Sequence, residues 1–301
     1  MKLMGNRFEI TVVSSDNEWA NQRIDDAVAE ISRIERLFTT YKEDSQTNLI
    51  NRNAGIAPVK VDKEVFDLVY RSKKISKLTQ GAFDITYGSI DKSLWNFDKD
   101  MKALPDAETA KKAVHLINYN NVLLDEKGTT VFLKYPGMRI GFGGIGKGYA
   151  AEMAKNLLKQ KGVTSGIVNA SGDLTAWGKQ PDGQDWTIGI ADPDAAEQPF
   201  SYFSISEMAV ATSGNYEKYV MIDGQKYSHT IDPKTGLPVK GIKSVTVICP
   251  NAEIADAMAT PITIMGVKAG LDMINQVNGI ECIIIDDDNI VHTSKHINLR
   301  I

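Results

Sequence analysis

Hydrophobic residues recur along the chain at spacings that predict α-helices. Between residues 18 and 38 they return every three or four positions, which places them on one face of a helix. This predicted buried stripe consists of Ile24, Ala27, Ile31, Ile34 and Phe38. The polar stretch TTYKEDSQT that follows predicts a loop. Further helices are predicted over residues 63–79, 106–117, 145–160, 252–265 and 267–277.

Short apolar runs separated by turn residues predict strands in the rest of the chain. One strand covers residues 8–13, two or three lie within 119–142 around the turn EKGT, and the second half is rich in strands up to Val247. GAFDITYG, at residues 81–88, predicts a strand or a tight turn. Hairpins are predicted at Asp182-Gly183, at Asp223-Gly224 and in ECIIIDDDNIVHT, whose exposed turn is Asp286–Asp288.

These elements alternate irregularly, and no repeat, low-complexity tract or flexible linker divides them. Helices interspersed with meander-like strands are typical of α+β folds rather than of a regular series of parallel strands and helices. Because 43% of the 301 residues are hydrophobic, the chain can bury a large core. We therefore predict one α+β domain over residues 1–301.

Charge and cysteine content exclude some classes of function. The 34 Lys and Arg residues against 38 Asp and Glu residues give a net charge of -4, with no basic block, which argues against a nucleic-acid partner. Cys249 and Cys282 lie in apolar runs and are predicted to be buried free thiols. The first residues, MKLMGNRFEITVV, lack the apolar core of a signal peptide, and no run has the length of a membrane span, so the sequence predicts a soluble chain.

The stretch RIGFGGIGKGYAAE, at residues 139–152, fits two phosphate-binding patterns at once, G-x-G-x-x-G and G-x-x-x-x-G-K. The dinucleotide-binding fold also needs an acidic residue at the end of the next strand, but that strand ends near Asn169 and Asp173 follows another glycine. The P-loop needs a hydroxyl after Lys147, where this chain has Gly148. What remains is a glycine turn before a helix whose free N–H groups and Lys147 are predicted to bind an anion.

Two further motifs carry candidate chemistry. Asp256 and Thr260 in ADAMAT stand four residues apart, so a helix places both oxygens on one face, where they suit Mg²⁺ if other oxygens complete the site. The alternative, which the spacing alone favours, is an exposed aspartate and a threonine bonded to its own helix. In YSHTIDPKTG, the strand residue His229 is a candidate general base or a structural histidine, and Asp232–Gly236 predicts a tight loop.

Three other residues have two interpretations each. Tyr41 either stacks on a planar ligand or packs back on the first helix. Asp84 and Asp173 lie beside glycines at predicted strand ends, where each is either a turn cap or a ligand contact.

Eight motifs in order resemble the FAD:protein FMN transferases, the ApbE family, along nearly the whole chain. They are LMGNRFEI, TTYKEDSQTNLINRNAG, GAFDIT, GFGGIGKGYAAE, NASGDL, VATSGNYEKY, YSHTIDPKTG and ADAMAT. The resemblance implies a T-fold-like core of mostly antiparallel strands packed with helices, with an FAD cleft between lobes. It also implies a Mg²⁺-dependent transferase that cleaves FAD, attaches FMN through a phosphoester bond to a threonine or serine of an acceptor protein, and releases AMP.

The resemblance also implies roles for particular residues. The Mg²⁺ ligands would be the side chains of Asp256 and Thr260 and the backbone carbonyl of Gly144. Residues expected to contact FAD are Met4, Tyr41, Ala82, Phe83, Asp84, Lys147, Asp173 and His229. His229 is the expected base for the acceptor hydroxyl, with Asp84 as a substitute, and Lys147 would assist cleavage of the diphosphate.

The chain departs from the family pattern at three positions. Gly141 stands where many members have aspartate, so one FAD contact is lost or replaced, while Asn6 replaces threonine and Lys234 replaces arginine. Alternatives are an FAD pyrophosphatase that forms FMN and AMP, a flavin-binding protein without catalysis, and a Rossmann oxidoreductase. Tyr41 favours transfer, because asparagine at this position accompanies hydrolysis in the family, and the Asp256–Thr260 pair argues against a non-catalytic protein.

The resemblance finally implies a class of partner and a compartment. Acceptors would be subunits of membrane complexes, such as sodium-translocating quinone reductases or Rnf-like complexes, that carry a Ser/Thr-Gly-Ala-Thr type motif. Many relatives are exported and lipid-anchored, whereas this chain shows neither a signal nor a lipobox cysteine. The sequence therefore leaves both a periplasmic and a cytoplasmic location open.

Overall fold

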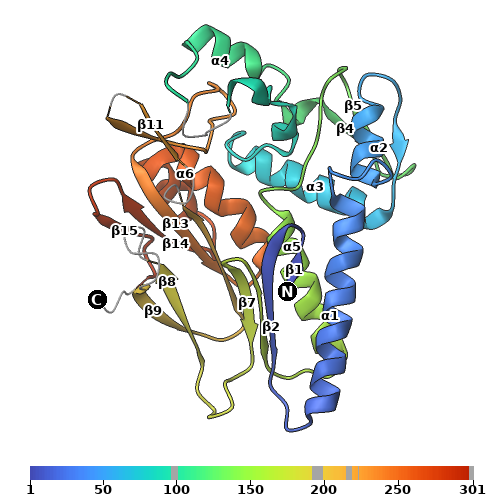
Figure 1. Ribbon diagram of the computed structural model, residues 1–301, viewed down its shortest axis with the longest axis vertical. Helices are drawn as coiled ribbons and strands as arrows, with labels where there is room; N and C mark the ends of the chain where they lie inside the picture. The colour runs from blue at the N-terminus through green and yellow to red at the C-terminus, as the bar shows by residue number, and fades with distance from the viewer. Residues whose placement is uncertain (96–100, 192–198, 215–218, 223, 298–301) are drawn as a thin grey trace.

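An antiparallel sheet of eight strands forms the centre of the structure, in the order β1-β2-β6-β7-β10-β13-β14-β15 (Figure 1). This computed structural model describes residues 1–95, 101–191, 199–214, 219–222 and 224–297. The strands are β1 Lys2–Leu3, β2 Asn6–Val12, β6 Gly166–Ala170, β7 Asp173–Trp177, β10 Met208–Gly214, β13 Ile242–Cys249, β14 Glu281–Asp286 and β15 Val291–Thr293. Every neighbouring pair is antiparallel, as the resemblance implies.

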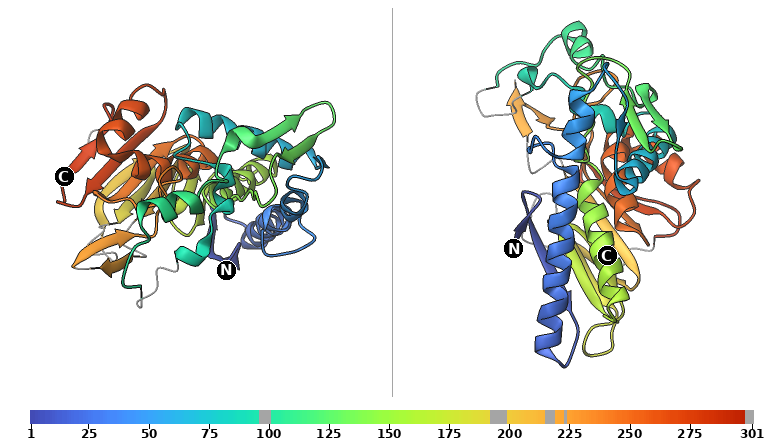
Figure 2. Two further views of the ribbon diagram at one scale, coloured as in Figure 1. Left: turned by 90° about the horizontal axis from the view of Figure 1, so that it is seen from above. Right: turned by 90° about the vertical axis from the view of Figure 1, so that its right-hand side faces the viewer.

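Three long helices pack against one face of this sheet: α1 Asn17–Phe38, α5 Gly146–Gln160 and α6 Ala252–Ile274 (Figure 2). Asp16 starts α1 by accepting the backbone N–H of Trp19. Four of the five residues of the predicted stripe are buried, namely Ala27, Ile31, Ile34 and Phe38, while Ile24 is half-buried. Helix α6 is interrupted at Gly266, which has a φ of 81°. The prediction of two successive helices there is confirmed, although the second ends at Ile274.

The opposite face of the sheet is covered by a hairpin of β8 Trp186–Ala191 and β9 Pro199–Ile205. Because both faces are covered, all five residues of β7 are buried: Leu174 and Ala176 pack toward the hairpin, and Trp177 belongs to the helix-side core. Strand β8 pairs with β9 and not with β7, so the prediction of a hairpin at Asp182-Gly183 is wrong. This turn joins strands of different sheets.

Smaller elements gather beyond the sheet, at the top of the view in Figure 1. They are the helices α2 Gln46–Arg52, α3 Lys63–Leu78 and α4 Ala107–Ala113, the strands β3 Val59–Lys60, β4 Val122–Asp125, β5 Thr130–Leu133, β11 Tyr219–Ile222 and β12 Gln225–Ser228, and the 3-10 helices η1 Ile85–Ser89, η2 Lys92–Leu94 and η3 Tyr119–Asn121. Strands β3, β5 and β4 form a three-stranded sheet, and β11 pairs with β12. An α+β fold is thus confirmed.

Local predictions failed where tertiary contacts or short caps decide the structure. Helix α2 begins inside the stretch predicted as a loop, because Ser45 caps it by accepting the N–H of Asn48. Of the two alternatives for residues 81–88, the strand is wrong, because the segment forms a turn and the 3-10 helix η1. Within 119–142 the prediction of two strands joined by EKGT is confirmed by the pairing of β4 with β5. The predicted hairpin between β11 and β12 is confirmed, although Asp223 itself and residues 215–218 of VATSGNYEKY lie outside the described residues.

The two cysteines are buried and unbridged, as predicted. Burial raises the pKa of Cys249 to about 11 and that of Cys282 to about 12. Because a raised pKa keeps the thiol protonated, both cysteines stay in the unreactive thiol form at pH 8. We expect no reaction with a chromogenic disulfide reagent in the native protein and two reactive thiols in urea. A thiol that reacts as fast before denaturation as after it would contradict this burial.

No helix in the described part of the chain has the length and hydropathy needed to cross a membrane.

Candidate active site

The first turn of α5 is capped by a side chain from another helix. Its N-cap residue, Ile145, provides no side-chain hydrogen bond. Instead the backbone N–H of Gly148 donates to Asp256 Oδ2 on α6 at 2.8 Å, and the N–H of Lys147 also bonds to this carboxylate. Asp256 therefore satisfies N–H groups that a helix start leaves without partners.

This cap corrects the prediction of a free anion-binding helix end. The N–H of Gly146 donates to the carbonyl of Phe142 at 2.7 Å, while those of Lys147 and Gly148 bond to Asp256. The first-turn N–H groups are thus occupied within the protein. An anion at this turn would have to bind the Lys147 ammonium group or a cation instead.

Lys147 and Asp173 form an ion pair beside the cap. The Nζ and Oδ2 atoms lie 2.7 Å apart, and the side chain of Asp173, the first residue of β7, is 4% exposed. Burial and the charge of Asp173 raise the pKa of Asp256, against the lowering effect of Lys147. Lys147 is thus close to two buried carboxylates, those of Asp173 and Asp256.

The residues present fit a magnesium ion. Asp256 supplies a carboxylate, Thr260 lies one helical turn later and is half-buried, and Gly144 has its carbonyl in the adjacent turn. Mg²⁺ prefers oxygen ligands, which these three groups offer. Among the described residues there is no metal-binding group of three or more His, Cys, Asp or Glu side chains. A site here would thus need the hydroxyl and carbonyl oxygens besides Asp256, with water or substrate oxygens completing the coordination.

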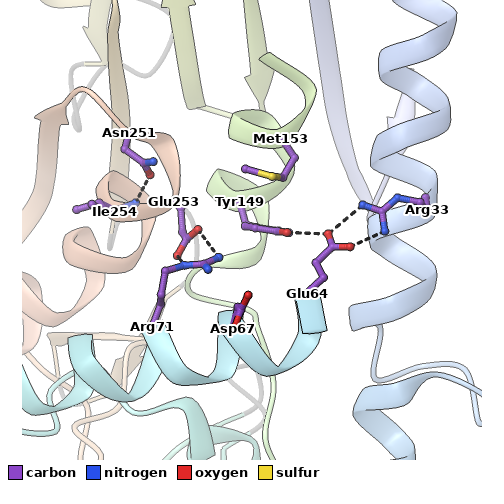
Figure 3. Close-up of a pocket in the computed structure, with 9 residues that line it drawn as sticks. All are labelled: Arg33, Glu64, Asp67, Arg71, Tyr149, Met153, Asn251, Glu253 and Ile254. Atoms are coloured by element: carbon purple, nitrogen blue, oxygen red, sulfur yellow. Dashed lines mark hydrogen bonds and ion pairs between the residues drawn. The ribbon is translucent and has the colours of Figure 1, made fainter. Parts of the chain in front are cut away.

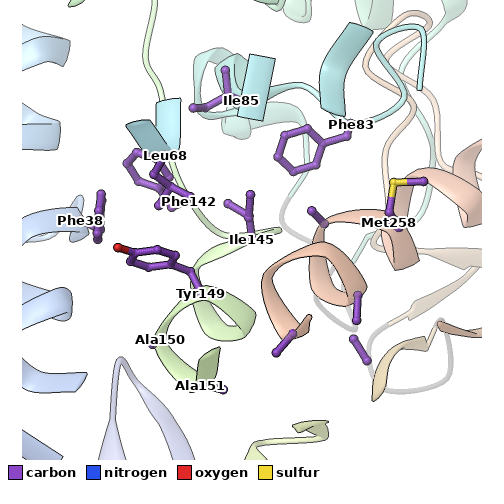
Figure 4. Close-up of a cluster of buried hydrophobic side chains, with 14 of the residues drawn as sticks. Phe38, Leu68, Phe83, Ile85, Phe142, Ile145, Tyr149, Ala150, Ala151 and Met258 are labelled. Atoms are coloured by element: carbon purple, nitrogen blue, oxygen red, sulfur yellow. The ribbon is translucent and has the colours of Figure 1, made fainter. Parts of the chain in front are cut away.

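Two of the predicted flavin contacts lie against the glycine turn. A Cβ atom on Gly144 would lie 3.5 Å from the Phe83 ring, and one on Gly146 would lie 3.7 Å from Met4 Cε. In the view of Figure 4, the Phe83 ring lies between Ile145, at the start of α5, and Met258 on α6. The Phe83 ring is 7% exposed and belongs to the main hydrophobic core, so it packs beside the glycine backbone. Ala82, directly before Phe83, is also buried.

Asp84 is a buried turn cap. Its Oδ1 accepts the N–H and the hydroxyl of Thr86, and its Oδ2 accepts the N–H of Tyr119 at 2.9 Å. Burial raises the pKa of this carboxyl group, against the three hydrogen bonds. The turn-cap interpretation is therefore confirmed, while contact with FAD stays a prediction.

Tyr41 and His229 are exposed. The side chain of Tyr41 is 96% accessible, so the alternative in which it packs on α1 is wrong. Its neighbour Thr40 lies beside Gly141, with 3.8 Å between Thr40 Cγ2 and the position of a Cβ on the glycine. His229 lies in a bend directly after β12, which ends at Ser228, and not within a strand as predicted.

The tight loop after His229 is confirmed and leads toward the GAFDIT segment. The N–H of Gly236 donates to the carbonyl of Asp232 at 2.8 Å. Lys234 Cε lies 3.8 Å from the Cβ position of Gly81, next to the predicted FAD contacts. The roles of His229 and Tyr41 on FAD stay predictions.

A surface pocket of about 620 Å³ adjoins the other side of α5 and contains none of the predicted site residues (Figure 3). Its lining consists of Arg33, Glu64, Asp67, Arg71, Tyr149, Met153, Asn251, Glu253 and Ile254. The Arg33–Glu64 and Arg71–Glu253 pairs both have N–O distances of 2.6 Å. Since these charges neutralise one another, the pocket offers no free cation to a diphosphate, and we do not assign FAD to it.

Sequence reasoning missed how α5 and α6 meet. A Cβ on Gly148 would lie 2.1 Å from the carbonyl oxygen of Ala252, so only glycine lets the helices approach this closely. Glu152 Oε2 accepts the N–H of Ala252 at 2.9 Å. Small residues at three- and four-residue spacing in both segments were the signal for close helix packing.

Comparison with known proteins agrees with this arrangement. The sequence pattern of the ApbE family matches residues 4–284. An FAD:protein FMN transferase from Klebsiella pneumoniae is 32% identical over 300 residues, covering 99% of this chain and 92% of that protein. One from Treponema pallidum is 31% identical over 282 residues, covering 89% of this chain and 78% of that protein.

Solved structures give the same result. The crystal structure of the ApbE protein from Thermotoga maritima has a TM-score of 0.87 and 31% identity, and covers 98% of this chain and 96% of that chain. The apo flavinyl transferase ApbE from Pseudomonas stutzeri has a TM-score of 0.85 and 27% identity, and covers 98% and 93%. With both sequence and fold matched along nearly its whole length, this chain belongs to the ApbE family.

Proposed function

We propose that this chain cleaves FAD, transfers FMN to a threonine or serine hydroxyl of an acceptor flavoprotein, and releases AMP. The observation that carries the proposal is the cluster of Lys147, Asp173 and Asp256 at the glycine turn, with Phe83 beside Gly144. It places a cation, oxygen ligands for Mg²⁺ and the buried Phe83 ring close to one another. The relatives named FAD:protein FMN transferases match along nearly the whole chain.

In this proposal, each residue of the site has a separate role in the reaction. When bound, a magnesium ion supplies positive charge that stabilises the diphosphate while its bond breaks. Asp256 and Thr260, with the carbonyl of Gly144, would hold that ion. Lys147, whose side chain is 28% exposed, can reach substrate phosphate while Asp173 holds it in place. Phe83 would contact the flavin.

The transfer step needs a base for the acceptor hydroxyl. The hydroxyl oxygen bonds to the FMN phosphorus, the bond from that phosphorus to the bridging oxygen of AMP breaks, and the hydroxyl proton passes to the base. His229 suits this role because it is exposed, so a macromolecular acceptor can reach it. Asp84 suits it less well, because its oxygens already accept three hydrogen bonds.

The acceptor in this proposal carries the Ser/Thr-Gly-Ala-Thr type motif in a subunit of a membrane redox complex, of the sodium-translocating quinone reductase or Rnf-like kind. The family resemblance supports this motif, and with it a location on the exported side of the membrane. Exposure of Tyr41 and His229 supports an acceptor that is a protein, since both side chains lie where another chain can contact them.

A labelling experiment tests the proposal. Incubation with FAD, Mg²⁺ and an acceptor domain bearing the motif should give a yellow-fluorescent acceptor band that survives denaturing electrophoresis, with one AMP released per flavin attached. Chelation of Mg²⁺, or alanine in place of the target threonine in the acceptor, should remove the band. AMP release without labelling would identify a pyrophosphatase, and the absence of both products would refute the enzymatic proposal.

A further inference from the structure

Helices α5 and α6 cap one another. Asp256 on α6 accepts N–H groups from the first turn of α5, and Glu152 on α5 accepts the N–H of Ala252, the first residue of α6, at 2.9 Å. The two helices lie antiparallel at this contact, because the earlier residue of α5, Gly148, contacts the later residue of α6, Asp256, and Glu152 contacts Ala252. Each helix start is therefore held by a carboxylate of the other.

Between these two caps, the backbones of α5 and α6 are in close contact. The carbonyl of Ala252 lies so close to Gly148 that a Cβ there would be 2.1 Å from its oxygen. Ala252 and Asp256 are four residues apart, hence one turn apart on the same face of α6. A shift of the first turn of α6 would therefore move the Asp256 carboxylate relative to the glycine turn.

The second oxygen of Glu152 forms a buried ion pair with Lys155. Oε1 lies 2.7 Å from Lys155 Nζ, and both side chains are 7% exposed. A buried ion pair contributes little net stability, because desolvation offsets the attraction, and apolar replacements often hold a fold equally well. The ion pair alone therefore does not explain why residue 152 is a glutamate. The hydrogen bond from the N–H of Ala252 to Glu152 Oε2 does explain it.

We propose that Glu152 is a positioning residue, which fixes the first turn of α6 and thereby places Asp256 for metal binding. The proposal rests on the magnesium site of the proposed function. It assigns to Glu152 no contact with metal, FAD or acceptor. Its effect is expected on metal affinity, because a ligand held out of place must be moved before it binds.

Two double variants separate this role from a structural one. Both contain Lys155→Met, so that no buried ammonium group loses its partner, and they have equal net charge and similar volume. Glu152→Gln/Lys155→Met keeps an oxygen that can accept the Ala252 N–H, whereas Glu152→Leu/Lys155→Met does not. Mn²⁺ binding to the full chain without FAD is measured by electron paramagnetic resonance, with Mg²⁺ as competitor.

We expect the leucine variant to bind Mn²⁺ about tenfold more weakly, as for other groups that orient a metal ligand. The Mg²⁺ concentration for half-maximal flavin transfer should rise by a similar factor, with the rate at saturating Mg²⁺ changed by less than about threefold. The glutamine variant should bind Mn²⁺ within about twofold of wild type. Ile188→Ala, on the opposite face of the sheet, serves as a control that lowers the melting temperature without changing Mn²⁺ affinity.

The outcomes distinguish this proposal from the proposed function. A folded leucine variant with wild-type Mn²⁺ affinity would reduce Glu152 to a structural role. If the leucine variant does not fold, Glu152→Ala/Lys155→Met takes its place in the same comparison. A wild-type chain that transfers flavin without binding Mn²⁺ would overturn the positioning role and leave transferase activity standing, whereas Mn²⁺ binding without flavin transfer would count against the proposed function alone.

Discussion

Replacing Asp256 by asparagine is expected to abolish magnesium-dependent flavin transfer while leaving the protein folded. The asparagine oxygen can still accept the N–H of Gly148, which bonds to Asp256 Oδ2 at 2.8 Å in the native chain. The negative charge that attracts Mg²⁺ is lost, however, and the charge stabilisation of the breaking bond goes with it. We expect turnover in the labelling assay to fall about a hundredfold or more.

Asp256→Ala provides the contrast. Alanine removes both the charge and the cap, so this variant should lose activity and also about 1–3 kcal/mol of unfolding free energy, the cost of a buried donor without a partner. Urea unfolding followed by circular dichroism measures the difference between the two variants. Full activity of the asparagine variant would refute the metal assignment, and equal stability of both variants would refute the cap.

Gly148→Ala is expected to destabilise the protein strongly although it places alanine in a helix. At an exposed helical position this exchange stabilises by about 1 kcal/mol. Here the new Cβ would lie 2.1 Å from the Ala252 carbonyl oxygen and 2.6 Å from Asp256 Cβ. Because backbone must move to relieve that overlap, we expect a loss of about 3 kcal/mol in unfolding free energy and a parallel loss of activity.

Gly143→Ala is the matched control for this prediction. Gly143 belongs to the same glycine stretch, has no positive φ, and a Cβ there would meet no atom within 4 Å. Its unfolding free energy should stay within about 0.5 kcal/mol of wild type. If both variants are equally stable, the close contact of α5 with α6 does not constrain the fold.

Much of the fold could be predicted because many of its helices and hairpins depend on residues that are close together in the sequence. The stripe of α1 and the extent of α5 follow from the spacing of apolar residues, and the confirmed hairpins follow from turn residues. Helix α2 was missed because it is short and depends on one cap, at Ser45. The partner of β8 could not be predicted, since strand pairing depends on contacts between distant parts of the chain.

The candidate site was predictable as a set of residues but not as a set of contacts. The order of motifs identified the family and drew attention to Lys147, Asp173 and Asp256. It did not show that Lys147 pairs with Asp173, or that Asp256 occupies the helix end that seemed free for a phosphate. In the sequence, Gly148 only marked the absence of the P-loop hydroxyl. In the structure, its missing side chain lets α6 approach α5 closely at Ala252.

The cap on α5 also determines at what stage of its synthesis the protein can form the proposed active site. Gly148 and Asp256 are 108 residues apart, so the glycine turn emerges from the ribosome long before the carboxylate that completes its helix. Contacts between such distant residues form late in folding, because the intervening chain must first be ordered. A nascent chain that has not yet exposed α6 lacks Asp256 and Thr260, so under the proposed function it would not cleave FAD until the C-terminal part of the protein has folded.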